Sequence, residues 1–295
     1  INNIDRIEEA KYICEIAKKY PNHQIKTGIR VNFDIDAGYT SRFGIDINNL
    51  KEIFELLKSN NVEVNGLHCH MSRARGIDAW KLRANTMLKL VENYKLCDID
   101  YISLGSGMFG KMDPELKAQF PLDAPDYDLY AEEVISLFAK FYEDKDKKPI
   151  LFTEPGTTLV SKYVDFLAKV IGVKNIRGKD FVLLNCSFHN LGETSQMKNL
   201  PIRIFKNEVD IKHVDNANFV GYTCLEQDVI YREYTGEISN GDFVLFGNVG
   251  GYSLVDKPSF IMPDYPMIML DNEGIQLIKR KENFSDIFKT FVFEE

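Results

Sequence analysis

Three short segments in the first half of the chain carry residues that could bind a cofactor. His70 lies in the run 66–72, a glycine loop occupies residues 104–107, and Glu154 stands before a Pro-Gly pair. An imidazole can stack on a ring, glycine N–H groups can approach a phosphate because no Cβ blocks them, and a carboxylate can pair with a ring nitrogen. Together the three segments predict a cofactor site.

These segments follow strand-like stretches in a repeating pattern. Repeated βα units favour a parallel sheet or a (β/α)8 barrel, in which functional groups sit at the C-terminal ends of the strands. We therefore expect the candidate residues to gather at one end of a barrel. Strand-like stretches are predicted at 26–32, 62–69, 100–104 and 149–153, and helical periodicity at 5–20, 47–59, 78–94 and 127–142.

The second half of the chain has a different pattern. From about residue 160, β-branched and aromatic runs replace helical periodicity, which indicates a β-rich domain. A complete (β/α)8 barrel needs about 250 residues, so only part of one fits before this change. The predicted fold class is α/β plus β: a partial TIM-like barrel over residues 1–158, followed by a C-terminal β-rich barrel or sandwich over residues 159–295.

Composition narrows the class of protein. The net charge is -8 and there is no block of Lys and Arg, which argues against a nucleic-acid partner. No apolar stretch is long enough to cross a bilayer. The cysteines include no C-x-x-C pair and the opening residues show no signal-peptide pattern, so we expect a cytoplasmic enzyme with reduced thiols.

The order of these landmarks resembles the fold-type III pyridoxal-phosphate-dependent decarboxylases, the group of ornithine, arginine and diaminopimelate decarboxylases, whose barrel is related to that of alanine racemase. The resemblance runs from Arg30 through the three segments to the runs 221–228 and 250–253. It implies pyridoxal 5'-phosphate as the cofactor and decarboxylation of an amino acid as the reaction. It also implies a homodimer with shared active sites, in which Cys224 and Asp228 reach the cofactor of the opposite subunit.

The resemblance implies catalytic roles for Glu154, His70 and Cys224. The Glu154 carboxylate is similar to the group that keeps the ring nitrogen of the cofactor protonated, and the His70 imidazole to the group that stacks on the ring. Cys224 matches the cysteine that protonates the substrate carbon after carbon dioxide leaves, which favours a decarboxylase over a racemase. His68 is expected to pack within the barrel, and no metal site is expected.

The resemblance also implies residues that bind the cofactor and the substrate. Gly105 and Gly107 match the phosphate-binding loop, and Tyr252 matches a phosphate-binding tyrosine of the β-rich domain. Asp228 and Glu226 are expected near the far end of the substrate. The full set of expected cofactor-binding residues is Arg30, His70, Ser72, Arg73, Gly105, Ser106, Gly107, Glu154 and Tyr252.

Three features depart from the pattern of this family: one lysine that is absent and two positions with a different residue. No lysine has the setting of the Schiff-base lysine, which we expect upstream of Ile1. Thr157 stands where the family has an arginine that helps to hold the phosphate, and we hypothesise that Arg73 or Arg75 supplies the positive charge. Leu225 stands where an acidic residue usually senses a second amino group, so the identity of the amino-acid substrate stays open.

Other functions remain open at this point. The nearest is an amino-acid racemase or epimerase on the same scaffold, which would change chirality without releasing carbon dioxide. A metal-dependent barrel hydrolase would use His68 and His70 at a strand end as zinc ligands. A non-catalytic cofactor carrier or regulatory homologue would fit the absent lysine and the replaced arginine.

Overall fold

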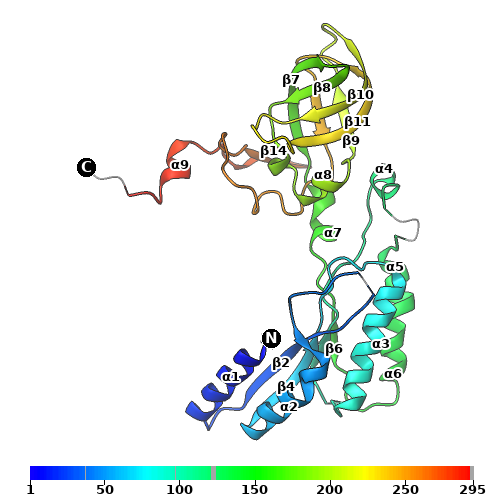
Figure 1. The fold of residues 1–295 in the computed structure, drawn as a ribbon, viewed down its shortest axis with the longest axis vertical. Helices are drawn as coiled ribbons and strands as arrows, with labels where there is room; N and C mark the ends of the chain where they lie inside the picture. The colour runs from blue at the N-terminus through cyan, green and yellow to red at the C-terminus, as the bar shows by residue number, and fades with distance from the viewer. Residues whose placement is uncertain (37, 97, 121–123, 293–295) are drawn as a thin grey trace. The chain divides into compact units, whose positions relative to one another are not determined.

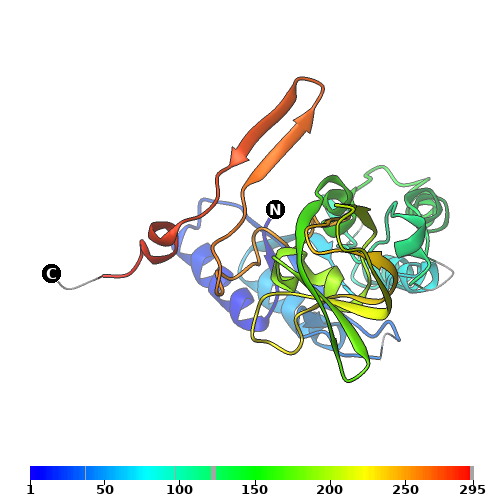
Figure 2. The same ribbon diagram turned by 90° about the horizontal axis from the view of Figure 1, so that it is seen from above.

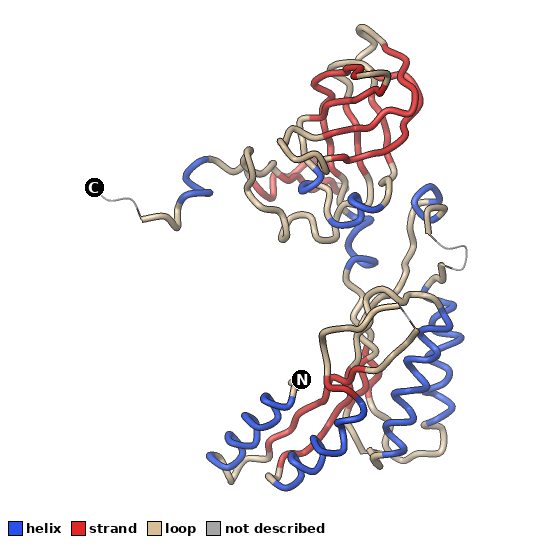
Figure 3. The backbone as a smooth tube through the Cα atoms, in the orientation of Figure 1, coloured by secondary structure: helices blue, strands red, loops and turns tan. Residues whose placement is uncertain are grey.

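The computed structural model describes residues 1–36, 38–96, 98–120 and 124–292. The chain forms two compact units, Ile1–Leu159 (unit 1) and Val160–Glu295 (unit 2). The elements of each unit can be followed in Figures 1 and 3. Cys97, one of the cysteines considered above, lies outside the described residues. Within the described part of the chain, no helix combines the length and the apolar character that a membrane span requires.

Unit 1 is built on a parallel sheet. Its strands pair in the order β1, β2, β4, β5, β6, and β3 pairs with the end of β2. Four of them, β2, β4, β5 and β6, coincide with the strands expected from the sequence, so the predicted βα repeat is confirmed. The strands are β1 (Asn3–Ile4), β2 (Ile25–Asn32), β3 (Ile45–Asp46), β4 (Val62–His68), β5 (Tyr101–Ser103) and β6 (Ile150–Phe152).

Helices connect these strands and cover the sheet with one apolar face each. In α3 the buried residues Trp80, Ala84 and Met87 recur at helical spacing, so one side of the helix faces the core. Figure 1 shows α3 and α6 side by side. The helices up to residue 160 are α1 (Ile7–Lys19), η1 (Ile47–Asn49), α2 (Leu50–Ser59), α3 (Ile77–Asn93), α4 (Pro114–Lys117), α5 (Tyr127–Tyr130), the π-helical turn η2 (Ala131–Ile135), α6 (Ser136–Phe141) and α7 (Thr157–Val160).

Unit 2 contains a six-stranded sheet in the order β11, β10, β8, β7, β12, β9. The β10–β8 pair is parallel and the other neighbouring pairs are antiparallel. The expected change to a β-rich second half is therefore confirmed. The strands are β7 (Phe166–Ile176), β8 (Lys179–Leu184), β9 (Ile202–Phe205), β10 (Lys212–Val220), β11 (Val229–Ile238) and β12 (Phe243–Phe246).

The remaining elements of unit 2 are short helices and a hairpin. The hairpin pairs β13 (Met267–Asp271) with β14 (Gly274–Lys279) as a separate two-stranded sheet, which is drawn in orange and red in Figure 2. Several large apolar side chains on it are exposed, among them Leu270 and Ile275. The short helices are η3 (Ser161–Tyr163), η4 (Phe188–Asn190), α8 (Glu193–Met197) and α9 (Phe284–Phe288).

Candidate functional site

The carboxyl ends of three strands bring together His68, Ser103 and Glu154. In the register of the sheet His68 on β4 pairs with Ser103 on β5, which pairs with Phe152 on β6. Glu154 follows shortly after β6, and its backbone N–H donates to the Gly105 carbonyl at 2.8 Å. Strand pairing therefore places all three side chains at one edge of the sheet, where parallel sheets carry their functional groups.

One carboxylate oxygen of Glu154 is held by two donors. Ser103 Oγ donates to Oε1 at 2.6 Å, and His68 Nε2 donates to the same oxygen at 3.2 Å. The Gly105 N–H donates to Ser103 Oγ at 3.1 Å, so the hydroxyl hydrogen of Ser103 is directed at Glu154. No described residue hydrogen-bonds to Oε2 of Glu154, and this oxygen is available to a ligand.

These contacts keep the Glu154 carboxyl ionised. The hydrogen bond from His68 is the largest cause that lowers the pKa of Glu154 from 4.5 to about 2. Partial burial acts in the opposite direction, and the hydrogen bond from Ser103 lowers the pKa further. A carboxylate that stays charged at neutral pH can hold a proton on a ring nitrogen.

His68 belongs to this site rather than only to the core. Its side chain is buried, as expected, but its Nε2 also contacts Glu154, a contact that the sequence pattern alone does not indicate. The other ring nitrogen, Nδ1, is also buried and has no hydrogen-bond partner among the described residues. The spacing of His68 and His70 could have indicated this role. Two histidines that are two residues apart at the end of a strand place both imidazoles on the same side of that strand.

His70 is a neutral imidazole. Its Nδ1 accepts a hydrogen bond from the Ser106 N–H at 3.2 Å, so this nitrogen carries no proton. Burial is the main cause that lowers the pKa of His70 below 6.5, and the positive charge of Arg30 lowers it further. An uncharged, partly buried ring of this kind is suited to stack on another aromatic ring.

The glycine loop packs directly on the His70 segment, residues 69–75. Gly105 and Gly107 have φ angles of +61° and +93°, a region that residues with a Cβ rarely adopt. A Cβ on Gly105 would lie 2.4 Å from the Cys69 carbonyl oxygen, and a Cβ on Gly107 would lie 2.2 Å from that of Met71. Both glycines are thus required by the contact between the two loops, a reason additional to ligand approach.

Arg30 lies on β2 next to His68, with which it pairs in the sheet register. Its Nη1 is 3.6 Å from Asp5 Oδ1, and its guanidinium lies over the Phe43 ring at 4.6 Å. The side chain is therefore fixed by an anion and a ring. Its expected contact with the cofactor stays a prediction.

The two arginines of the His70 segment are held loosely. The Arg73 guanidinium lies 5.3 Å from the centre of the Tyr39 ring, and Arg75 Nε donates to the Ser72 carbonyl at 3.1 Å. Neither forms an ion pair with a described residue, so both charges are available to an anion. The hypothesis that Arg73 or Arg75 holds the phosphate, and the cofactor role of Ser72, stay predictions; unchanged cofactor affinity in both alanine variants would contradict the arginine hypothesis.

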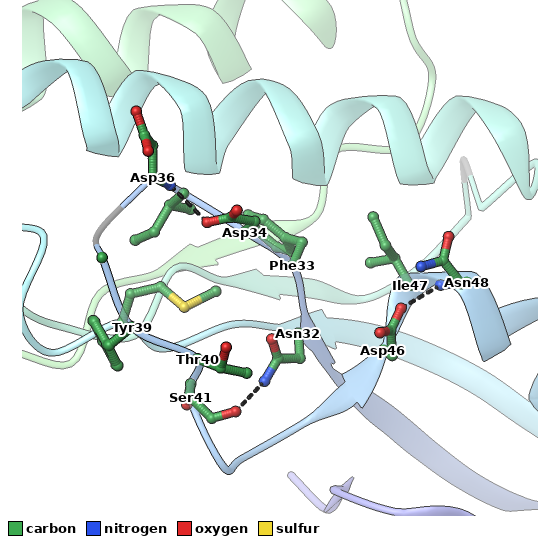
Figure 4. Close-up of a pocket in the computed structure, with 13 residues that line it drawn as sticks. Asn32, Phe33, Asp34, Asp36, Tyr39, Thr40, Ser41, Asp46, Ile47 and Asn48 are labelled. Carbon is green, nitrogen blue, oxygen red and sulfur yellow. Dashed lines mark hydrogen bonds between the residues drawn. The ribbon is translucent and has the colours of Figure 1, made fainter.

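A cavity of about 580 Å³ opens beyond the end of β2 (Figure 4). Met71 of the His70 segment lines it, so the cavity adjoins the candidate site. Figure 4 shows Asn32 Nδ2 donating to the Ser41 carbonyl, at 2.8 Å, across this region. Its polar and acidic walls suit a small charged molecule. The lining residues are Asn32, Phe33, Asp34, Ile35, Asp36, Gly38, Tyr39, Thr40, Ser41, Asp46, Ile47, Asn48 and Met71.

In unit 2, Cys224, Glu226 and Asp228 lie between β10 and β11. Cys224 and Glu226 are exposed, whereas Asp228 is buried. The Asp228 carboxylate accepts from the Phe188 N–H at 2.8 Å, and from the N–H and Oγ1 of Thr223 at 3.1 and 2.6 Å. Asp228 therefore ties this turn to a neighbouring segment. The substrate roles of Glu226 and Asp228 and the catalytic role of Cys224 stay predictions.

Tyr252, also in unit 2, is exposed and has a φ of +55°. This left-handed conformation is uncommon for a bulky residue. Gly192 packs against the same turn, since a Cβ on Gly192 would lie 2.4 Å from the Gly251 carbonyl oxygen. Residues held in such conformations often lie at ligand sites, which supports the expected phosphate contact of Tyr252 without testing it.

The residues gathered in unit 1 fit pyridoxal phosphate. Glu154 offers a charged oxygen to the ring nitrogen, and His70 offers a neutral face to the ring. The backbone N–H groups of Gly107 and Met108 donate to no described residue, so they can serve an oxyanion. Among the residues that the structure describes, no three His, Cys, Asp or Glu side chains are grouped to hold a metal ion.

Two family models match the chain. The model of the pyridoxal-dependent decarboxylase pyridoxal-binding domain matches residues 2–161, and the model of the C-terminal sheet domain of pyridoxal-dependent decarboxylases matches residues 104–250. The diaminopimelate decarboxylases of Aquifex aeolicus and Methanocaldococcus jannaschii are 26% and 24% identical to it. Each alignment covers 97% of this chain, and 68% and 67% of those proteins.

Solved structures share the fold. The diaminopimelate decarboxylase of M. jannaschii in complex with L-lysine has a TM-score of 0.81 and 22% identity, covering 99% of this chain and 69% of that one. The arginine decarboxylase of Paramecium bursaria Chlorella virus bound to agmatine has a TM-score of 0.67 and 19% identity, covering 88% and 68%. These similarities confirm a partial barrel followed by a sheet domain.

Proposed function

Because this chain belongs to the family of pyridoxal-dependent decarboxylases, we propose specific roles for its site residues and a substrate to test first. Membership confirms the predicted resemblance, with pyridoxal 5'-phosphate as cofactor and amino-acid decarboxylation as the reaction, and it favours decarboxylation over the racemase and metal-hydrolase alternatives. Diaminopimelate, named for both relatives above, is the first candidate substrate, and arginine is the second.

The observation that carries the proposal is the charged Glu154 carboxylate with one oxygen held and the other free. When bound, pyridoxal phosphate supplies an electron-withdrawing ring that stabilises negative charge on the substrate carbon. Glu154 Oε2 holds the proton on the ring nitrogen, which strengthens that withdrawal. His68 and Ser103 fix Oε1, so the carboxylate does not turn away or take up a proton.

His70 and the glycine loop orient the cofactor. The neutral His70 ring covers one face of the cofactor ring and excludes water from it. The hydrogen bond between Ser106 and His70 Nδ1 couples the angle of the imidazole to the position of the loop. The free N–H groups of Gly107 and Met108 bind the phosphate oxygens.

Unit 2 contributes the proton donor and part of the proposed dimer interface. In the proposed homodimer, Cys224 of one subunit protonates the substrate carbon in the site of the other, and Tyr252 binds phosphate. The exposed apolar side chains of the β13–β14 hairpin support a dimer, because contiguous apolar surface usually marks an interface. The free thiols of the described cysteines suit the reducing cytoplasm, where we place the protein.

The first experiment measures carbon dioxide release by the full-length protein with pyridoxal phosphate and each candidate amino acid. Release from meso-diaminopimelate with formation of lysine is the expected result. Borohydride reduction followed by peptide mapping identifies the lysine that binds the cofactor. Inversion of a stereocentre without release of carbon dioxide would contradict the proposed function.

A second experiment tests the shared site. Glu154→Gln is expected to be inactive as a pure homodimer, and Cys224→Ala is expected to lose most of its turnover or to release an altered product. Mixed dimers of the two variants should regain part of the wild-type activity, because one of their two sites then contains both native residues. No recovery in dimers shown to be mixed would contradict the sharing of sites between subunits.

A further inference from the structure

Arg83 on α3 is a fully buried cation that forms no ion pair with a described residue. Its relative exposure is 0%, and within the described residues no carboxylate lies within ion-pair distance. The guanidinium stacks over the Trp80 ring at 4.4 Å. Burial lowers the pKa of Arg83, which records the cost of desolvating the charge. A cation in this setting must be stabilised by dipoles.

The dipoles come from the two loops that form the candidate cofactor site. Arg83 Nη1 donates to the carbonyls of Leu104 and Ser106 at 3.1 and 2.9 Å, which are in the glycine loop. Nη2 donates to the carbonyls of Met71 and Ala74, both at 3.1 Å, which are in the His70 segment. One planar guanidinium thus joins both loops to α3.

Trp80 makes an additional contact of the same kind. Its Nε1 donates to the Gly107 carbonyl at 3.2 Å. The carbonyls of Ser106 and Gly107 therefore both point toward α3. In a trans peptide the C=O and the following N–H point in opposite directions, so the N–H groups of Gly107 and Met108 face away from α3. These are the N–H groups that donate to no described residue.

We propose that Arg83 is a positioning residue for the phosphate of the cofactor. It fixes the peptide planes so that the Gly107 and Met108 N–H groups point at the phosphate, and its buried charge, screened by no described carboxylate, favours an anion beside the loop. It does not touch the phosphate itself. This inference rests on the proposed function, in that the anion is taken to be part of pyridoxal phosphate.

The experiment compares two ligands in the full-length protein, measured by equilibrium binding without substrate. Pyridoxal phosphate and pyridoxal differ only in the phosphate. Arg83→Met is expected to raise the dissociation constant of pyridoxal phosphate about tenfold or more, in keeping with the strength of hydrogen bonds to charged groups, and to leave that of pyridoxal within about twofold. Inorganic phosphate should likewise protect the wild type, and not the variant, against thermal unfolding.

Two further variants separate positioning from general stability. Met87→Ala removes a buried side chain from the same helix without affecting a loop carbonyl, so it should lower the melting temperature but leave the ratio of the two affinities unchanged. Arg83→Lys keeps the charge but loses the planar fork, and its ratio should lie between those of the wild type and Arg83→Met. If Arg83→Met does not fold, Arg83→Lys carries the comparison alone.

The outcomes are distinguishable. An equal loss of affinity for both ligands in Arg83→Met, or a ratio in Arg83→Lys equal to that of the wild type, would overturn the positioning role. A wild-type protein that binds neither ligand would overturn the proposed function instead. A selective loss for pyridoxal phosphate supports both.

Discussion

His68 and Glu154 contact each other across the end of a strand that lies between theirs. His68 ends β4, Glu154 follows β6, and β5 separates the two, yet His68 Nε2 lies 3.2 Å from Glu154 Oε1. Ser103 at the end of β5 fills the space between them and donates to the same oxygen. The carboxylate is therefore fixed by side chains from two successive strands, and its orientation depends on the register of the sheet.

His68→Leu removes a donor to Glu154 and should lower turnover about tenfold or more, because the carboxylate becomes less well held and easier to protonate. The effect acts through Glu154, so kcat should fall while the KM for the amino acid changes little. Steady-state kinetics at several pH values measure this. His68→Gln, which keeps a donor, should recover part of the loss. Wild-type kcat in His68→Leu would contradict the role.

The lowered pKa of Glu154 predicts how stability without cofactor depends on pH. In the folded state the pKa is about 2 and the ordinary value is 4.5, so the unfolded chain binds the proton more readily. The contribution of the ionised carboxylate is therefore fully present above about pH 4.5 and is lost as the pH falls toward about 2. Urea unfolding of wild type and Glu154→Gln should show a difference that shrinks over this range. Ser103→Ala should narrow the pH range over which this difference shrinks, because the variant lacks one of the hydrogen bonds that lower the pKa of Glu154.

The pKa of His70 should lie below that of a free imidazole. Burial and the Arg30 charge both oppose protonation, so an NMR titration of His70 should give a midpoint below 6.5. Removing the charge in Arg30→Leu should raise that midpoint but not restore it fully, because burial is the larger cause. For the same reason His70 contributes stability that is present above pH 6.5 and declines below it. A midpoint above 6.5 in the wild type would be inconsistent with the Ser106 hydrogen bond.

Gly107→Ala should destabilise the protein by about 1–3 kcal/mol and weaken cofactor binding, because the new Cβ meets a carbonyl and the backbone is left-handed. A Cβ at this position would lie 2.2 Å from the Met71 carbonyl oxygen. Gly172→Ala is the matched control: a Cβ there meets nothing within 4 Å and φ is not positive. Urea unfolding of the two variants measures the difference. Equal stability would mean that the loop can move apart from the His70 segment.

Asp228→Ala should lower the free energy of unfolding by about 1–3 kcal/mol without substrate, because three donors lose a buried acceptor. These donors are the N–H of Phe188 and the N–H and hydroxyl of Thr223. Glu226→Ala, on the same turn but exposed, should change stability little. If Asp228→Ala alters only the KM for the amino acid, its role is in substrate binding and not in the turn.

The sequence predicted best those features that depend on local periodicity. The strands and helices of unit 1 follow from apolar spacing, and the placement of Glu154 follows from the end of its strand. In contrast, the apolar start of β11 is interrupted by the adjacent Arg232 and Glu233, so its sequence does not mark a strand of ten residues. Strand pairing, which only the fold determines, made this segment part of the sheet.

The contacts of His68 and Arg83 could not be predicted from periodicity because each joins segments distant in sequence. The sequence nevertheless indicates that Arg83 is unusual. It lies between Trp80 and Met87 on the apolar face of a helical pattern, where a charged side chain is rarely buried unless it has hydrogen-bond partners. For His68 the chain offered two equivalent imidazoles, and only the register of β4 with β5 decides which of them meets Glu154.

The attachment of both loops to Arg83 has a consequence for how this region can be recombined between homologous proteins. A glycine loop transferred alone would have to pack on the Arg83 of the recipient protein. A His70 segment transferred alone would have to pack on the recipient's glycine loop. Residues 66–107, a block that includes both loops and all of α3, contain Arg83 together with the four carbonyls to which it donates. Chimaeric proteins with junctions at the ends of this block should inherit the donor's cofactor preference intact.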